Sequence, residues 1–338
     1  MASAGASLSA AKLVRADTAT RGHRPWAVYM PATGHHVTRP FLNWWLQYGR
    51  ESALGWPVTE PLRLGNRAVQ YFERGALAEA PRSRDPLGIV PLDLGAQWLD
   101  RRESPTDGLL ASDHESAFFF PQTDLGVHPE LWTAYREAGG AFTYGYPLRW
   151  ASEGQGGLTQ VFQRAMLTST GGTVSAHPVG AWQAGLERLP MARVRQLANI
   201  STYDPAAFAP AFGPTAKRWA EVDLTRQVAT FFDGDRPVYR ALVSTGLYPD
   251  FTPAGNYGIF VRLDRARLVS FGDSSKTYNL PDVRYIQYFT DRWIGFHYAY
   301  WHDEFGQTHS TGCVNMRLAD ARWAWDFCGQ GTRVVVHH

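Results

Sequence analysis

Residues 309–316 read His-Ser-Thr-Gly-Cys-Val-Asn-Met and carry the strongest chemical signal in the chain. A cysteine directly after a glycine, with His297 upstream, is the minimum needed for thiol-based acyl transfer, in which a thiolate attacks a carbonyl and an imidazole accepts the thiol proton. Because glycine has no side chain to block an approach, the N–H groups of Gly312 and Cys313 can point at a developing oxyanion. Cys313 is one of only two cysteines in 338 residues, and its place in such a turn predicts a nucleophile.

Residues 310–315 resemble the S-x-G-C-[IV]-[RN] signature of the YkuD-type L,D-transpeptidases, which cross-link bacterial peptidoglycan through an acyl-cysteine. Other parts of the chain are similar to family segments and follow in the family's order: 243–257, 296–306 and 331–336. The resemblance covers residues 219–338. It implies a β-sandwich with the cysteine near its rim, and chemistry that needs no cofactor.

The resemblance also assigns roles around Cys313. It implies that Cys313 is the nucleophile, that His297 moves protons, and that a main-chain carbonyl beside the histidine orients the imidazole. Tyr298 stands where the family has a small residue; we expect its carbonyl to orient His297 and its ring to narrow the acyl pocket. Thr311 stands where the family often has His or Lys, so both departures bear on substrate preference.

Two other histidines compete with His297 for the role of base. His309 is close to Cys313 in sequence, but neighbours on a strand or turn need not face each other. His302 matches a non-catalytic family position, and we interpret it as a hydrogen-bonded scaffold residue.

Several further side chains are candidates for supporting roles. A tyrosine hydroxyl often assists the oxyanion in the family; Tyr285 and Tyr288 both lie upstream of the histidine, and the choice between them stays open. We expect Ser310 to hold the turn or the imidazole, and Asn315 to hydrogen-bond locally or touch substrate. Cys328 has no glycine turn or histidine just before it, so we expect a free thiol in the core.

The composition is that of a folded protein without a strong electrostatic preference. Hydrophobic residues make up 44% and charged residues 19%, and the formal net charge of +2 does not indicate nucleic-acid binding. No apolar run is long enough to span a membrane, and residues 1–24 lack the apolar core of a signal peptide, so we expect a disordered lead-in there. The sequence contains no P-loop, dinucleotide fingerprint or metal-ligand pattern, and we expect neither a metal nor a cofactor.

The first half of the chain contains an internal duplication. Shifted by ninety residues, residues 55–57 (Gly-Trp-Pro) fall on 145–147 (Gly-Tyr-Pro), and Gln70–Leu77 fall on Gln160–Leu167. The two units, 34–100 and 124–186, resemble the LGFP-type repeats of cell-wall-associated proteins. Two interpretations of this half remain: a rigid spacer and a glycan-binding module. If it binds glycan, we expect the aromatic side chains at the equivalent turns, Trp56 and Tyr146, to be partly exposed and to contact the glycan.

Each unit predicts the same elements. Residues 41–48 and 131–138 have helical spacing that stops at a glycine, and residues 68–78 and 158–168 alternate as half-buried strands do. Two units are fewer than an open solenoid needs, so we expect the copies to pack on each other about a pseudo-two-fold axis.

The fold class we predict is mainly β with some α. A duplicated α+β repeat domain covers 25–186, a proline-rich linker covers 187–214, and a β-sandwich catalytic domain covers 215–338. In the catalytic domain we expect strands at 227–232, 237–243, 257–262, 284–289 and 293–297, with a hairpin turn at Asp233-Gly234 and a helix over 318–327.

The resemblance implies a peptidoglycan L,D-transpeptidase that forms 3-3 cross-links through an acyl-cysteine. The alternatives are an L,D-carboxypeptidase, which hydrolyses the same acyl-enzyme, and a non-catalytic wall-binding protein. The expected partners are peptidoglycan stem peptides and carbapenem β-lactams that acylate Cys313. We further expect a monomer in an extracytoplasmic, cell-wall or periplasm-like space, with a part in cell-wall biogenesis and cell shape.

Overall fold

The computed structural model describes residues 26–83, 85, 87–101, 116–154, 156–208, 217–269 and 278–338, together with the backbone of strand β1 (Lys12–Leu13). The remainder of the expected lead-in lies outside the described residues. Among the helices described, none is both long and apolar enough to cross a membrane.

The chain divides into two compact units. Unit 1 contains the described residues of Met1–Ala134 and of Tyr144–Phe208, and unit 2 contains Tyr135–Thr143 and the described residues of Ala209–His338. A short segment from within the second sequence repeat therefore belongs to the C-terminal unit.

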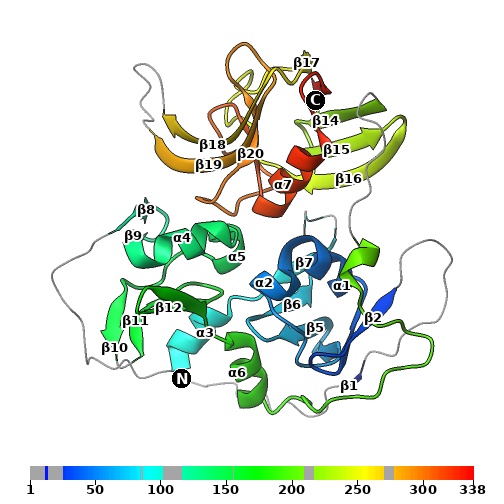
Figure 1. The fold of residues 1–338 in the computed structure, drawn as a ribbon, viewed down its shortest axis with the longest axis vertical. Coiled ribbons are helices and arrows are strands. Elements are labelled where there is room, and N and C mark those ends of the chain that lie inside the picture. The colour runs from blue at the N-terminus through cyan, green and yellow to red at the C-terminus, as the bar shows by residue number, and fades with distance from the viewer. Residues whose placement is uncertain are drawn as a thin grey trace. The chain divides into compact units, whose positions relative to one another are not determined.

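The sequence repeat is visible as two copies built from matching elements, coloured blue to cyan and cyan to green in Figure 1. Copy 1 consists of β2 (Ala27–Met30), β3 (His35–Thr38), α1 (Phe41–Trp44), the π-helical turn η1 (Trp45–Gly49), α2 (Arg50–Ala53), β4 (Leu62–Leu64), β5 (Arg67–Phe72), β6 (Gly75–Glu79), β7 (Ile89–Pro91) and α3 (Leu94–Arg101). Copy 2 consists of β8 (Phe118–Phe120), β9 (Leu125–Val127), α4 (Pro129–Glu137), α5 (Gly140–Tyr144), β10 (Ser152–Gly154), β11 (Gly157–Val161), β12 (Met166–Thr170), β13 (Thr173–Ala176) and α6 (Val179–Leu186). A short 3-10 turn, η2 (Pro205–Phe208), closes the unit.

The copies confirm one expectation about local structure and correct another. The first helical region ends at Gly49, where η1 ends and Arg50 takes a non-helical backbone (φ +45°), and the short α2 follows as a separate turn. Each stretch expected as one strand is a hairpin, β5 with β6 and β11 with β12, in the antiparallel sheets β1-β4-β5-β6-β7 and β10-β11-β12-β13. Alternation continues across a tight turn, which is why the pattern alone does not locate it.

The copies exchange their last helices. In α3, the N–H of Ala96 donates to the carbonyl of Gln163 in copy 2 (3.1 Å); in α6, the N–H of Ala181 donates to the carbonyl of Glu73 in copy 1 (3.0 Å). A Cβ on the neighbouring glycines, Gly95 and Gly180, would overlap backbone oxygens of the opposite copy. This reciprocity is the arrangement that two copies packed about a two-fold axis require.

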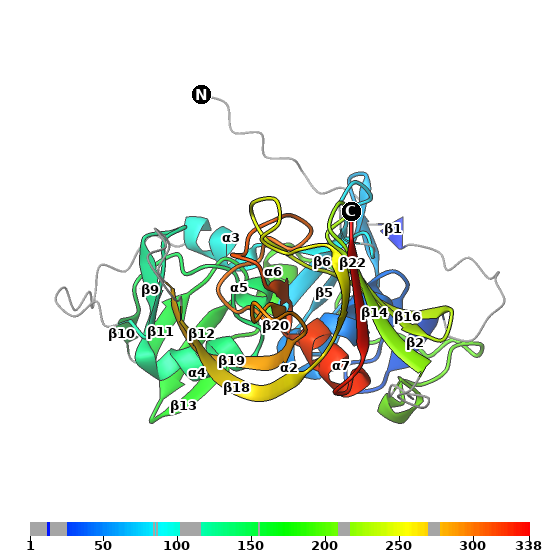
Figure 2. The ribbon, with the colours of Figure 1, turned by 90° about the horizontal axis from the view of Figure 1, so that it is seen from above.

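Unit 2 contains two β-sheets with a helix against both. One sheet has the order β16-β15-β14-β22-β17 and the other β18-β19-β20-β21; β14 pairs with β22 and β20 with β21 in parallel. The strands are β14 (Arg218–Asp223), β15 (Val228–Asp233), β16 (Arg236–Leu242), β17 (Gly255–Gly258), β18 (Val261–Val269), β19 (Asn279–Tyr288), β20 (Gly295–Tyr298), β21 (Val314–Met316) and β22 (Arg333–His337), and the helix is α7 (Leu318–Phe327). α7, shown in Figure 2, contacts β19 and β20 of the second sheet, and its Trp323 ring packs against Phe231 of β15 in the first.

Aromatic rings join the two sheets in the core of unit 2. Phe231 of β15 and Phe296 of β20 are fully buried with ring centroids 5.9 Å apart, and Phe327 of α7 packs edge-on against Phe231. The sheet-on-sheet core makes this unit the predicted β-sandwich. The predicted helix has the observed bounds of α7, whereas the strand expected over 257–262 divides between β17 and β18, which lie in different sheets.

Candidate active site

The cysteine turn and the histidine strand lie side by side. Cys313 immediately precedes β21, and β21 pairs in parallel with β20, so that His297 stands opposite Asn315. The sequence separates these segments by a long loop, and the parallel ladder brings them together. The candidate nucleophile and the candidate base are therefore positioned by neighbouring strands of one sheet.

The turn before β21 is fixed by hydroxyl groups. The Ser310 hydroxyl accepts a hydrogen bond from the N–H of Gly312 (3.0 Å) and donates to the carbonyl of Cys313 (2.6 Å). The Thr252 hydroxyl donates to the carbonyl of Gly312 (2.5 Å). Gly312 has φ +141°, and a Cβ there would lie 2.8 Å from the Phe251 carbonyl oxygen, so the turn requires glycine.

The Cys313 sulfur is partly exposed and is surrounded by backbone groups. Its thiol lies 3.7 Å from the carbonyl of Trp293, whose side chain is 58% exposed. Burial of the sulfur raises the pKa of the Cys313 thiol to about 11, although a hydrogen bond from the Gly295 backbone opposes this shift. The thiol is consequently protonated at neutral pH and needs a base for attack.

His297 is the candidate for that base. Its ring is buried, and Nδ1 lies 3.1 Å from the carbonyl oxygen of Tyr298. Because a carbonyl can only accept, Nδ1 carries the proton and Nε2 keeps its lone pair. Burial lowers the pKa of His297 to about 4, against the opposing effect of the Tyr298 carbonyl, so the ring is neutral at pH 7.

The ring of Tyr298 does not narrow the acyl pocket, contrary to expectation. Adjacent residues of β20 point to opposite faces of the strand, so the Tyr298 ring lies on the face away from His297. Its buried hydroxyl donates to the carbonyl of Arg136 (2.8 Å).

The rival histidines form a scaffold. His302 is fully buried; its Nδ1 accepts from the N–H of Glu304 (3.2 Å), and its Nε2 lies 2.9 Å from the side-chain amide of Asn315. Both ring nitrogens are therefore engaged. His309 stacks on His302 with ring centroids 4.1 Å apart and pairs with the Glu304 carboxylate (2.5 Å). Asn315 also exchanges backbone hydrogen bonds with Ser244.

Of the two expected tyrosines, Tyr288 is the one near the sulfur, and Tyr278 joins it. Burial is the main cause that raises the pKa of the Tyr288 phenol to about 12. Tyr288 also lies close enough to Cys313 that a negative charge on the sulfur raises this pKa further. The ring of Tyr285 instead contacts Trp325. Tyr278 was not among the candidates from the sequence. Burial and a negative charge on Cys313 raise the pKa of the Tyr278 phenol as well, and its hydroxyl hydrogen-bonds to the Thr311 side chain. Tyr278 lies just before β19, and no spacing rule separates it from the other tyrosines.

The turn restricts which N–H groups can serve an oxyanion. The N–H of Gly312 donates to Ser310 within the turn, whereas the N–H of Cys313 has no acceptor among the described residues. The Cys313 N–H is therefore the better placed donor of the two.

The two glycan-binding candidates belong to unit 1, and the second cysteine belongs to unit 2. Tyr146 is only 8% exposed and packs edge-on against Phe120, so the expected exposure is wrong for this residue; Trp56 is half-buried against Trp45 and Tyr203. Aromatic packing inside unit 1 buries the Tyr146 ring and leaves the Trp56 ring partly exposed. Cys328 is a free thiol in the core, and among the described residues no cluster suited to a metal is present.

The C-terminal part of the chain matches a known protein family. Residues 217–336 match the family model of the YkuD L,D-transpeptidase catalytic domain. No curated protein matches the chain.

Solved structures of L,D-transpeptidases are among the structural matches. LdtMt1 in complex with imipenem is 21% identical (TM-score 0.34), and the match covers 36% of this chain and 59% of that one. An L,D-transpeptidase from Mycobacterium smegmatis is 16% identical (TM-score 0.34; 54% and 73% covered), and one from Stackebrandtia nassauensis is 26% identical (TM-score 0.30; 36% and 56% covered). The chain thus spans 59% of the first of these. On the family match, residues 217–336 are a catalytic domain of the YkuD L,D-transpeptidase family.

Proposed function

We propose that this protein is a peptidoglycan L,D-transpeptidase that forms 3-3 cross-links. The sulfur of Cys313 attacks the amide carbonyl between the L-centre and the D-residue of a donor tetrapeptide stem. The C–N bond breaks, the terminal D-amino acid leaves with a proton from His297, and a thioester remains. The amine of an acceptor stem then attacks the thioester, gives its proton to His297 and releases the Cys313 thiol.

The observation that carries the proposal is the hydrogen bond from His297 to the Tyr298 carbonyl (3.1 Å). It leaves Nε2 as the unprotonated nitrogen on the strand beside the Cys313 turn. A neutral imidazole next to a neutral thiol supports general-base activation at the moment of attack rather than a standing thiolate.

This pairing predicts an unusually flat pH profile. With the pKa of His297 lowered to about 4 and that of Cys313 raised to about 11, both groups keep their protonation states between those values. We expect the acylation rate constant to change little between pH 6 and 9, measured by stopped-flow with a carbapenem. A bell-shaped profile inside that window would instead indicate a thiolate–imidazolium pair.

The developing oxyanion would be stabilised by the N–H of Cys313 together with a phenol. Burial raises the pKa of both Tyr278 and Tyr288, so each phenol keeps its proton at neutral pH and can donate a hydrogen bond. Removing one such donor typically lowers the rate by about 100- to 1,000-fold.

Intact-protein mass spectrometry tests the proposal. Wild type incubated with a carbapenem should gain one drug mass, and Cys313→Ala should gain none. Cys328→Ala is the matched control, because this buried thiol should be unreactive and its removal should leave the adduct in place. A folded, reduced wild type without an adduct would contradict the proposal.

Product analysis with donor and acceptor stem peptides then separates transfer from hydrolysis. A dimer linked between third-position diamino acids supports transpeptidation. Release of tripeptide alone would make the protein an L,D-carboxypeptidase. The cell-wall substrate places its work outside the cytoplasm, and co-sedimentation of the protein with peptidoglycan sacculi tests whether the repeats bind the wall.

A further inference from the structure

The segment 135–143 lies in copy 2 of the repeat but belongs to unit 2. The ninety-residue shift that aligns the copies places it on residues 45–53, which belong to unit 1. Residues 45–53 of copy 1 therefore show the sequence and structure of this segment when it belongs to unit 1.

One pair of aligned residues, Gly140 and Arg50, shows how the two segments differ. Gly140 has φ +57°, and Arg50, its counterpart, has φ +45°. A left-handed backbone at this position therefore does not by itself demand glycine. A Cβ on Gly140 would, however, overlap the backbone and carbonyl oxygen of Tyr300, and the next N–H, that of Ala141, donates to that carbonyl (2.9 Å). Glycine at 140 therefore serves the close approach to Tyr300, which lies just after the end of β20.

The last turn of α4 contacts Tyr298 directly. The Tyr298 hydroxyl donates to the carbonyl of Arg136 (2.8 Å), and both residues are almost fully buried. The backbone carbonyl of the same tyrosine holds Nδ1 of His297 (3.1 Å). One residue thus links the segment to the imidazole through two hydrogen bonds.

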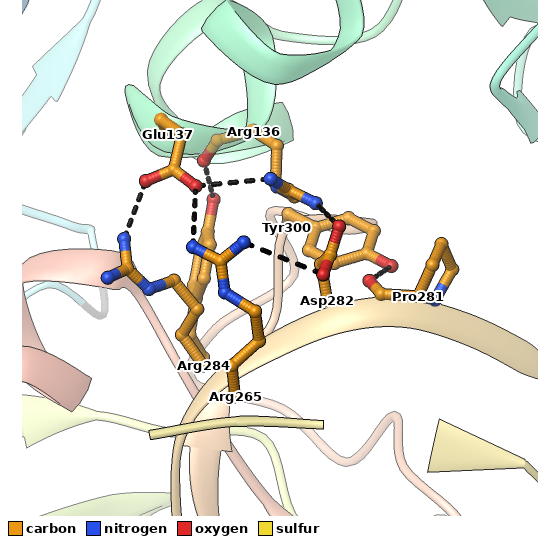
Figure 3. Close-up of polar contacts among 8 residues, drawn as sticks. Arg136, Glu137, Arg265, Pro281, Asp282, Arg284 and Tyr300 are labelled. Atoms are coloured by element: carbon orange, nitrogen blue, oxygen red, sulfur yellow. Dashed lines mark hydrogen bonds and ion pairs between the residues drawn. The ribbon is translucent and has the colours of Figure 1, made fainter. Parts of the chain in front are cut away.

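Charged side chains fasten the segment to the sheet (Figure 3). Arg136 pairs with Asp282 of β19, and Glu137 pairs with Arg284 of β19 (2.6 Å). Arg265 of β18 lies between Glu137 and Asp282, at 3.7 and 3.6 Å from their carboxylates. At the aligned positions copy 1 has the uncharged residues Leu46 and Gln47.

Apolar contact secures the other end of the segment. The Phe142 ring lies 4.2 Å from the guanidinium carbon of Arg317 and packs edge-on against Phe305 (6.1 Å between centroids). The aligned residue of copy 1 is Ser52. The copies differ at each of these contacts, and the substitutions in copy 2 match what unit 2 presents.

We infer that residues 135–143 complete the catalytic unit and that Tyr298 is the positioning residue through which they orient His297. The inference rests on the proposed function in that it takes His297 as the base. The hydroxyl of Tyr298 fixes its ring against Arg136, the fixed ring holds the backbone of β20, and that backbone presents the carbonyl that selects the Nδ1–H tautomer.

The first test removes one atom. Tyr298→Phe in the full chain keeps the ring and loses the hydrogen bond to Arg136; Tyr300→Phe, which loses a buried hydroxyl bonded to Pro281 (2.6 Å), is the matched control. We expect Tyr298→Phe to lower the rate constant of Cys313 acylation about five- to tenfold, and the control to change it less than twofold.

The second test introduces a steric clash between the segment and Tyr300. Gly140→Ala should lower the acylation rate constant about 10- to 100-fold, because a displaced backbone at Tyr300 misplaces the histidine nearby. Gly234→Ala is the control: Gly234 has φ +61° but nothing within 4 Å of the added Cβ, so it reports the backbone strain alone.

Nitrogen-15 NMR of the imidazoles gives a readout that general destabilisation would not move. The His297 signal, assigned by its loss in His297→Gln, should show the Nδ1–H tautomer in wild type and both controls. It should show a mixture in Tyr298→Phe and Gly140→Ala. Wild-type tautomer and wild-type acylation in both variants would overturn the inference. If wild type itself is never acylated, the proposed function fails, and the tautomer still decides the role of Tyr298.

Discussion

The two copies of the repeat are alike in the residues that hold each copy together. They differ in the residues by which copy 2 contacts unit 2. In each copy a buried glutamine amide holds two backbone carbonyls: Gln70 donates to His36 and Thr59 (2.7 and 2.9 Å), and Gln160 donates to Gly126 and Arg149 (2.7 and 2.8 Å). These partners are related by the same ninety-residue shift.

The difference lies in the helical segment that follows. Residues 45–53 stay within unit 1, whereas residues 135–143 carry a charged pair, a glycine and a phenylalanine that fit unit 2. A duplication thus acts as an internal control: shared side chains mark the repeat framework, and diverged side chains mark a new partner.

The largest effect we expect is on stability, from Gln160→Ala and Gln70→Ala. Each variant leaves two buried carbonyls without a donor, which should lower the free energy of unfolding by about 2–5 kcal/mol. Gln160 should cost more, because its Oε1 also accepts from the N–H of His128 (3.2 Å), while Oε1 of Gln70 is buried without a partner among the described residues. Urea unfolding measures both losses. Negligible losses would show that the copies do not share this framework, and equal losses would exclude a contribution from the His128 hydrogen bond.

A smaller effect should follow from Arg136→Met. Arg136 is 4% exposed and pairs with Asp282, so its loss should lower the free energy of unfolding by about 1–3 kcal/mol. Arg226→Met is the matched control, since that arginine is 81% exposed and its pair with Asp223 should be worth under about 0.5 kcal/mol. Urea unfolding measures both free energies. If the two variants lose similar amounts, the charged contacts of Arg136 do not explain the difference in sequence between the copies.

The smallest effect concerns acid stability. The hydrogen bond from Arg136, helped by the charges of neighbouring arginines, outweighs desolvation and lowers the pKa of Asp282. A carboxyl with a lowered folded-state pKa stabilises the protein above its unfolded value, about 3.9, and this contribution is lost as pH falls through the folded value. Because Asp282 is 42% exposed, solvent screening limits the contribution to about 0.5 kcal/mol. Asp282→Asn should flatten the stability curve below pH 4; an unchanged slope would exclude this carboxyl.

Much of the fold follows from local pattern. The Asp233-Gly234 turn between β15 and β16, and the helix over 318–327, lie where turn chemistry and helical spacing predict them. The hairpins of the repeat could not be predicted because the alternation continues across each tight turn. The exchange of α3 and α6 and the place of residues 135–143 in unit 2 depend on contacts between segments far apart in the chain, for which periodicity carries no information.

The site divides in the same way. Cys313 and Gly312 are visible in the sequence because a nucleophile turn requires those residue types. The place of Tyr278 beside Thr311 and near Cys313 is hidden in the sequence, since a tyrosine just before a strand resembles a core residue. The direction of the Tyr298 ring was likewise misjudged, because its partner, the Arg136 carbonyl, lies in the other half of the sequence.

The most direct test of the account is the time course of Cys313 acylation by a carbapenem in wild type, His297→Ala, His302→Ala and His309→Ala. We predict that His297→Ala is slowest, by at least about 100-fold, because it alone removes the unprotonated nitrogen that accepts the thiol proton. A larger loss in His302→Ala or His309→Ala, or a wild-type rate in His297→Ala, would contradict the assignment of the base and with it the role of Tyr298.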